Sequence, residues 1–287
     1  MKSLQKTAIS AAAVALLAGL ASASAFAADT PADPEAAGNP IAANVTVVSD
    51  YRYRGISQTN FKPAIQGGFD YAHESGFYIG NWNSSISWIS DAAPATANTR
   101  VTAPIEMDFY GGIKKEFIGE GFASDFGVLQ YYYPTSGLNV SGTQANPNTT
   151  ELYAAQNFTF GAVTGFVKFS YSVSPIFGFA NSTGSYYPDL TVNYDTGVWG
   201  LALNAHVGYQ YVAGNVQGST TGASNSSLYS YTDWKLGVTK DFGGGLSLSA
   251  AYIGTDAGKT GSVYNYTSPT GKNLGGSTGI VALTKTF

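Results

Sequence analysis

The sequence predicts an all-β protein, a transmembrane antiparallel up-and-down β-barrel of about 12 strands. Three observations predict this fold. The chain begins with an export signal, and no later apolar run reaches the roughly 18 residues of a membrane-spanning helix. Charged residues are too few to cover a soluble domain. Segments of about ten residues alternate apolar and polar side chains, as the strands of membrane barrels do.

The first 28 residues have the pattern of a secretory signal peptide. Lys2 and Lys6 precede the apolar run AISAAAVALLAGL, and small residues follow, with cleavage expected after Ala27 or Ala28. A membrane-anchor helix is the alternative, but the run is rich in alanine and no basic stop follows it. Residues 29–40 are polar and rich in proline, which predicts a flexible periplasmic lead, and residues 41–287 are assigned to the barrel.

Composition excludes several classes of protein. Asp, Glu, Lys and Arg make up 11% of the chain, against about 25% in ordinary soluble domains, whereas aromatic residues reach 14%. Loss of the two signal-peptide lysines changes the net charge from −4 to −6, so nucleic acid is not expected as a partner. The chain has no Cys, which excludes disulfide and thiolate chemistry.

The strand pattern is clearest in residues 201–211, LALNAHVGYQY. Every second residue from Leu201 to Tyr211 is apolar or aromatic, and the residues between them are Ala202, Asn204, His206, Gly208 and Gln210. Residues 105–117, 163–173 and 232–242 repeat this scheme. A soluble sandwich shows the same alternation with its apolar face inward, so alternation alone does not decide between the two folds.

The connections between strands separate the two folds, because they alternate in length along the chain. The short ones are residues 74–76, 118–121, 161–165, 195–199 and 243–245, and the long ones are 90–104, 134–148, 175–184, 213–227 and 256–273. Outer-membrane barrels have short periplasmic turns and longer outer loops. An even strand count then predicts that both termini are periplasmic.

Aromatic residues gather toward the strand ends, as in the girdles that barrels place at the membrane boundary. The expected girdle residues are Tyr51, Tyr53, Trp82, Trp88, Tyr209, Tyr211 and Trp234. The chain ends on Phe287 at the close of an alternating strand, which matches the C-terminal signal read by the barrel-insertion machinery. Lys285 departs from that signal, which prefers an apolar residue there, but a lysine near a strand end can reach the interface.

The polar face of the strands is the candidate lining of a pore. If residues 47–58, VVSDYRYRGISQ, continue as a strand, Tyr51 and Tyr53 face lipid and the charged residues between them face water inside the barrel. The candidate pore-lining residues are Asp50, Arg52, Arg54, Asp70, Glu106, Asp108, Lys114, Lys168, His206, Asp233, Lys235 and Asp241. Acidic residues outnumber basic ones in this set, which indicates a weak preference for cations. Arg52 and Arg54 can bind an anionic group near the outer mouth, or they can pair with Asp50 or Asp70.

The run from 47 to 82 resembles the TorF family of porin-like proteins of Gram-negative outer membranes. The matching elements are SDYRYRGISQ at 49–58, PAIQGGFDY at 63–71 and SGFYIGNW at 75–82. This resemblance implies an outer-membrane barrel with channel activity. It implies no particular substrate and no catalytic residues.

These observations favour an outer-membrane porin-like channel for passive diffusion of small hydrophilic solutes or ions. The partners expected are the lipid bilayer, the insertion machinery and the solutes, with no cofactor. A non-conducting structural or adhesion barrel with functional outer loops is the alternative, because about twelve strands can enclose either a narrow pore or a filled lumen. An enzyme is not expected, because no G-x-S-x-G motif accompanies the two histidines, and these are too far apart for a metal site.

Overall fold

Twelve strands pair edge to edge into a closed ring in the computed structural model, which describes residues 40–92, 101–138, 145–220 and 222–287. The predicted signal peptide and lead therefore lie outside the described residues, apart from Pro40. The strands of the ring are β1 (Ile41–Val48), β4 (Ala64–Ala72), β5 (Phe77–Ser85), β6 (Ile105–Gly119), β7 (Phe122–Tyr132), β8 (Thr149–Phe160), β9 (Val163–Ser172), β10 (Tyr186–Asp195), β11 (Leu201–Gln210), β12 (Tyr231–Asp241), β13 (Leu246–Thr255) and β16 (Thr278–Thr286).

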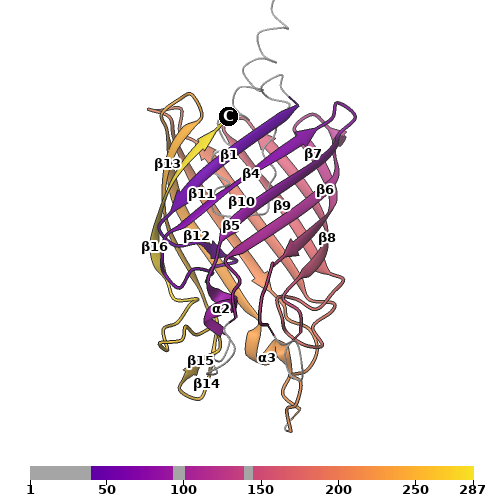
Figure 1. The fold of residues 1–287 in the computed structure, drawn as a ribbon. Helices are drawn as coiled ribbons and strands as arrows, with labels where there is room; N and C mark the ends of the chain where they lie inside the picture. The colour runs from indigo at the N-terminus through magenta and orange to yellow at the C-terminus, as the bar shows by residue number, and fades with distance from the viewer. Residues whose placement is uncertain (1–39, 93–100, 139–144, 221) are drawn as a thin grey trace, which may run out of the picture.

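The ring has up-and-down topology. Each strand pairs antiparallel with its neighbours in chain order, and β1 pairs with β16 to close the barrel (Figure 1). Closure gives each of these strands a partner strand on both sides, so the wall has no free edge strand. The predicted fold class and strand count are confirmed.

Four short strands and two short helices lie outside the wall. They are β2 (Arg52–Tyr53), β3 (Ile56–Ser57), β14 (Lys259–Thr260), β15 (Val263–Tyr264), α2 (Trp88–Ala92) and α3 (Asn225–Tyr229). No helix in the described residues is long and apolar enough to cross a membrane.

The two ends of the barrel differ in their connections. All the long connections, with α2, α3 and β14–β15, lie at one end, and the short turns lie at the other (Figure 1). The start of β1 and the C-terminus lie at the short-turn end, where the backbone N–H of Phe287 donates to the carbonyl of Ala43 at 2.8 Å. The predicted sorting of connections by length is confirmed. There is one further long connection, residues 49–63 between β1 and β4, and the expectation that residues 47–58 form one strand is wrong beyond Val48.

The wall carries its apolar side chains outward. In β9, Val167, Phe169 and Tyr171 are exposed, whereas Lys168 and Ser170 between them are buried. This distribution is the inverse of a soluble β-sandwich and matches a wall with hydrocarbon outside and polar groups inside. A shift of one residue would move Lys168 into lipid, at a cost of roughly 2–4 kcal/mol at the bilayer midplane, so the alternation fixes the register.

Candidate functional site

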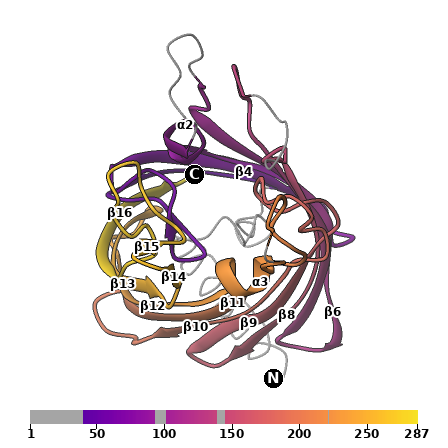
Figure 2. The same ribbon diagram turned by 90° about the horizontal axis from the view of Figure 1, so that it is seen from below.

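The connection between β1 and β4 folds into the barrel, and we call residues 49–63 the inner segment. β2 and β3 form a hairpin within it, and Figure 2 shows this indigo stretch lying inside the ring of strands. The two turn residues, Arg54 and Gly55, both have positive φ, at 45° and 77°. Two-residue hairpin turns of this kind need positive φ at both positions, which glycine adopts without strain and arginine does not. Contacts around Arg54 must therefore hold its conformation.

Arg54 reaches across the barrel to two strands of the opposite wall. Its guanidinium forms two hydrogen bonds with the carboxylate of Glu151 in β8, at 3.1 and 2.8 Å. A third bond, at 2.6 Å, goes to the side-chain oxygen of Gln210 in β11. The guanidinium carbon also lies 4.1 Å from the ring centre of Tyr187. Arg54 and Glu151 are each 1% exposed, so their charges compensate each other away from bulk water.

Arg52 fixes the other side of the hairpin. Its Nε atom lies 2.5 Å from an oxygen of Asp50, and its Nη1 atom donates to the carbonyl oxygens of Gly55, Leu274 and Gly276. The last two residues belong to the connection that leads into β16, so Arg52 joins the inner segment to a second long connection. Of the alternatives considered for Arg52, the structure shows pairing with Asp50. Arg54 instead pairs with Glu151, which the sequence analysis did not single out.

A cluster of tyrosines surrounds Glu106 beside the inner segment. The hydroxyl groups of Tyr51 and Tyr133 donate to the two carboxylate oxygens of Glu106, at 2.5 and 2.7 Å. The hydroxyl groups of Tyr53 and Tyr131 lie 2.5 Å apart. Burial, followed by the charge of Glu106, raises the pKa of both Tyr51 and Tyr133 well above the ordinary value of 10.0. Both phenols therefore remain protonated donors that satisfy the buried carboxylate.

The prediction that Tyr51 and Tyr53 face lipid is wrong. They are 2% and 7% exposed and lie inside the barrel. Val45 and Val47 do face outward, so the expected alternation holds within β1 and ends with it. Beyond Val48 the chain leaves the wall, and the period-two rule no longer relates one side chain to the next.

The remaining girdle residues divide into two groups. Trp82 lies directly opposite the buried Asp108 in the ladder, which places both inside, and Trp88 belongs to α2, where it packs against Tyr133. The girdle prediction is therefore wrong for Trp82 and Trp88. Three residues do lie on the outer face: Tyr209 is 39% exposed, Tyr211 stacks in a row with Tyr186 and Phe169, and Trp234 lies opposite the exposed Val207.

The candidate pore-lining residues all lie on the inner side of the barrel. Nine of them are buried: Asp50, Arg52, Arg54, Asp70, Glu106, Asp108, Lys168, Asp233 and Lys235. The other three, Lys114, His206 and Asp241, are partly exposed. Asp241 lies beside the β12–β13 turn, where its carboxylate accepts the backbone N–H of Gly243 at 2.7 Å.

Two further polar clusters line the wall. In one, Tyr110 donates to Asp70 at 2.6 Å and Tyr78 donates to Asp125 at 2.7 Å. In the other, Asp233 accepts from Tyr187 at 2.8 Å and lies 3.0 Å from Nε2 of His206. In both clusters a tyrosine hydroxyl donates to a buried or half-buried carboxylate.

The glycines of the wall explain how so many tyrosine rings fit inside. A side chain at Gly80, Gly127 or Gly208 would collide with the ring of Tyr110, Tyr153 or Tyr187, respectively. Each ring therefore packs against the bare backbone of the neighbouring strand, in space that a side chain at the glycine would fill.

Three further inward polar residues, Glu151, Asp125 and Asp189, were not predicted, whereas Gln210 lies on the polar face expected for its strand. Glu151 could have been found, because it alternates with the exposed Leu152 at the start of β8. The described residues contain no group of three or more His, Asp or Glu side chains that could hold a metal ion.

Comparison with solved structures places this barrel among porin-like folds. The KdgM porin superposes with a TM-score of 0.50 at 5% sequence identity, over 86% of this chain and 99% of that one. The NanC porin gives a TM-score of 0.49 at 7% identity, over 85% and 98% of the two chains. At such low identity the likeness concerns the fold alone. No curated protein matches the chain. The resemblance to the TorF family by name is not confirmed.

One family model covers nearly the whole chain, residues 32–287. It therefore includes the inner segment and the complete barrel described above. The chain belongs to this family, described as bacterial proteins of unknown function (Gcw_chp).

Proposed function

We propose that the protein is an outer-membrane porin-like channel for passive diffusion of small hydrophilic solutes or ions, with the inner segment as its constriction. The observation that carries the proposal is a polar interior crossed by a charged hairpin inside a wall with an apolar outer face. Charged groups held across a lumen set the size and sign of the ions that pass.

The same proposal assigns a direction to the barrel. Outer-membrane barrels place short turns in the periplasm and long loops outside. Both ends of residues 40–287 are then periplasmic, and the mouth with α2 and α3 opens to the exterior. Phe287, 72% exposed beside the first strand, is proposed as the residue read by the insertion machinery. The polar interior and the tyrosine–carboxylate bonds support a role in permeation rather than catalysis.

One observation favours a second candidate, a non-conducting barrel whose outer loops carry the function. Arg52, Glu106 and Tyr131 are at most 2% exposed, so the interior around the inner segment is tightly filled. A filled lumen stabilises a barrel without conducting. The channel and the non-conducting barrel differ in whether water and solutes pass the inner segment at Arg54.

Liposome swelling separates them. The folded protein, verified by a heat-dependent shift in gel mobility, is reconstituted in liposomes and challenged with isotonic arabinose, raffinose and a dextran. The proposal expects swelling in arabinose, slower swelling in raffinose and none in the dextran. If folded protein gives no swelling in arabinose, the channel proposal fails and the loop-based candidate replaces it.

A further inference from the structure

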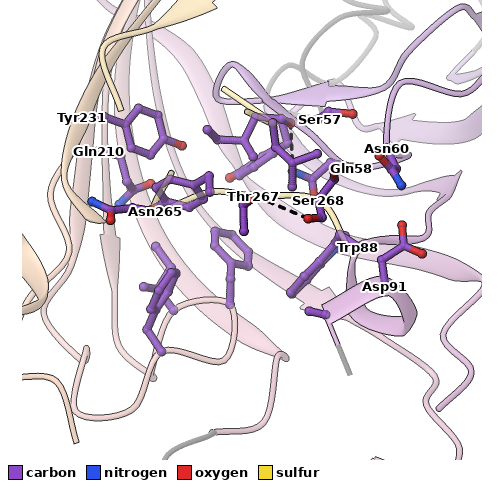
Figure 3. Close-up of a pocket in the computed structure, with 18 of the residues that line it drawn as sticks. Ser57, Gln58, Asn60, Trp88, Asp91, Gln210, Tyr231, Asn265, Thr267 and Ser268 are labelled. Atoms are coloured by element: carbon purple, nitrogen blue, oxygen red, sulfur yellow. Dashed lines mark hydrogen bonds between the residues drawn. The ribbon is translucent and has the colours of Figure 1, made fainter. Parts of the chain in front are cut away.

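A cavity of about 240 Å³ lies at the long-loop mouth of the barrel, and we call it the vestibule. Tyr53 and Ile56 of the inner segment contribute to it, with Trp88 and Asp91 of α2 on one side and Tyr231 and Asn265 on the other (Figure 3). Pockets for drug-sized ligands measure about 300–1,000 Å³, so the vestibule suits a small molecule.

Aromatic rings dominate its lining: Tyr53, Trp88, Tyr133, Phe177, Phe179, Tyr231 and Tyr266. The rings hold one another in place. Tyr53 and Phe177 have ring centres 5.4 Å apart, and those of Tyr231 and Tyr266 are 5.2 Å apart. The Tyr266 hydroxyl also donates to a backbone carbonyl at 2.7 Å. These fixed rings present the electron-rich faces to which cations are attracted.

The charges of the vestibule also favour a cation. Among its described lining residues, Asp91 is the one charged side chain, and no Lys, Arg or His contributes. The Asp91 carboxylate accepts a hydrogen bond from the Ser87 hydroxyl at 2.8 Å. Arg54 contacts the Tyr53 ring, but its charge is compensated by Glu151.

Trp88 contributes its indole ring to the lining, and it lies on the same short helix as Asp91. The ring packs edge-on against Tyr133, with ring centres 5.5 Å apart, so its position is fixed.

We propose that the vestibule binds a small quaternary ammonium ion. Rings of Trp and Tyr recognise such cations, a single carboxylate favours their charge, and the volume suits a molecule of a few carbon atoms. This inference rests on the proposed function, because it places a solute-selection site at the outer mouth of the channel.

Choline is the probe, and 3,3-dimethylbutan-1-ol is its neutral control with the same shape and hydroxyl group. Binding to the folded protein in detergent is measured by isothermal titration calorimetry, with glucose as a neutral ring-shaped solute. The charge should make choline bind at least about tenfold more tightly than its neutral counterpart. Equal affinity of the two, or tighter binding of glucose, would overturn the proposal.

Two substitutions test the residues. Asp91→Asn should weaken choline binding roughly two- to fivefold, since an amide keeps the hydrogen bond to Ser87 but loses the charge. Trp88→Leu should weaken it roughly two- to thirtyfold, and Trp88→Phe by less. The matched controls are Asp195→Asn and Trp199→Leu at the short-turn end, which should bind as the wild type does. If the Asp91 and Trp88 variants fold and bind choline unchanged, the vestibule is not the site.

The binding measurements and the liposome-swelling test can succeed or fail independently of each other. Binding without swelling of liposomes would retain the vestibule site and remove the channel function. Swelling without choline binding would retain the channel and remove the site.

Discussion

Glu151→Gln tests whether the inner segment is held by its buried ion pair. The substitution keeps the size of the side chain but removes the carboxylate charge that pairs with the guanidinium of Arg54, whose side chain is 1% exposed. Breaking a buried pair in this way costs roughly 3–5 kcal/mol. The Tyr187 ring, 4.1 Å from the guanidinium carbon, and the bond to Gln210 remain and offset about 1 kcal/mol of this. We therefore expect a loss of about 2–4 kcal/mol.

The inner segment should open at a lower free-energy cost than the barrel wall, because the barrel strands pair independently of Arg54. Opening of the inner segment can be measured by the rate of trypsin cleavage, since Arg52 and Arg54 are potential cleavage sites that are buried in the wild type. Glu151→Gln should be cut after Arg54, leaving a fragment that begins at Gly55. Urea unfolding followed by tryptophan fluorescence measures the accompanying change in stability.

The double variant Arg54→Gln with Glu151→Gln is the control, because it removes both charges. It should be more resistant to trypsin cleavage after Arg52 than Glu151→Gln is, and it should recover about 1–3 kcal/mol relative to the sum of the two single variants. Strictly additive effects, or a Glu151→Gln variant as resistant as the wild type, would refute the role given to the pair.

Three further predictions concern the wall and the tyrosine cluster. Leu236→Arg, at a side chain that is 64% exposed, should cost about 2–4 kcal/mol in lipid vesicles near the midplane, whereas a change below about 0.5 kcal/mol would mean that this face meets water. Because burial and then Glu106 raise the pKa of Tyr51, the unfolded chain loses this proton first as the pH rises above 10. The free energy of unfolding should then fall by about 1.4 kcal/mol per pH unit for this group, and Tyr51→Phe should remove that slope in alkaline urea titrations. Gly127→Ala should destabilise the barrel by about 1–3 kcal/mol in urea unfolding, since its methyl group would displace the Tyr153 ring, and an unchanged midpoint would contradict this packing.

The wall could be predicted from sequence because the alternation of apolar and polar residues within each strand identifies its outer and inner faces. In β12, Leu236 and Val238 alternate with Lys235 and Thr239, and the structure places the first pair outside and the second inside. Local alternation was sufficient there, because pairing with an adjacent strand changes neither the two-residue alternation of side chains nor the side of the wall on which each side chain lies. The length of the connections was also local information, and it separated the two ends of the barrel.

The inner segment could not be predicted in the same way. Its run of Tyr51, Arg52, Tyr53 and Arg54 alternates like a strand, yet its conformation depends on partners far along the chain. Arg54 meets residues 97 and 156 positions later in the sequence. The local signal was Gly55, which permits the hairpin turn but does not say that the hairpin enters the lumen. The vestibule was missed for the same reason, because its rings come from several separate connections.

Single-channel conductance of the folded protein in a planar bilayer tests the central claim most directly. The proposed channel, constricted by the inner segment, predicts discrete ohmic steps in the wild type. It predicts larger steps with altered ion selectivity when Arg52→Ala and Arg54→Ala are combined, because the hairpin then loses its bonds to Asp50, Glu151 and Gln210. A silent bilayer from correctly folded wild-type protein, or steps that the double substitution leaves unchanged, would contradict it.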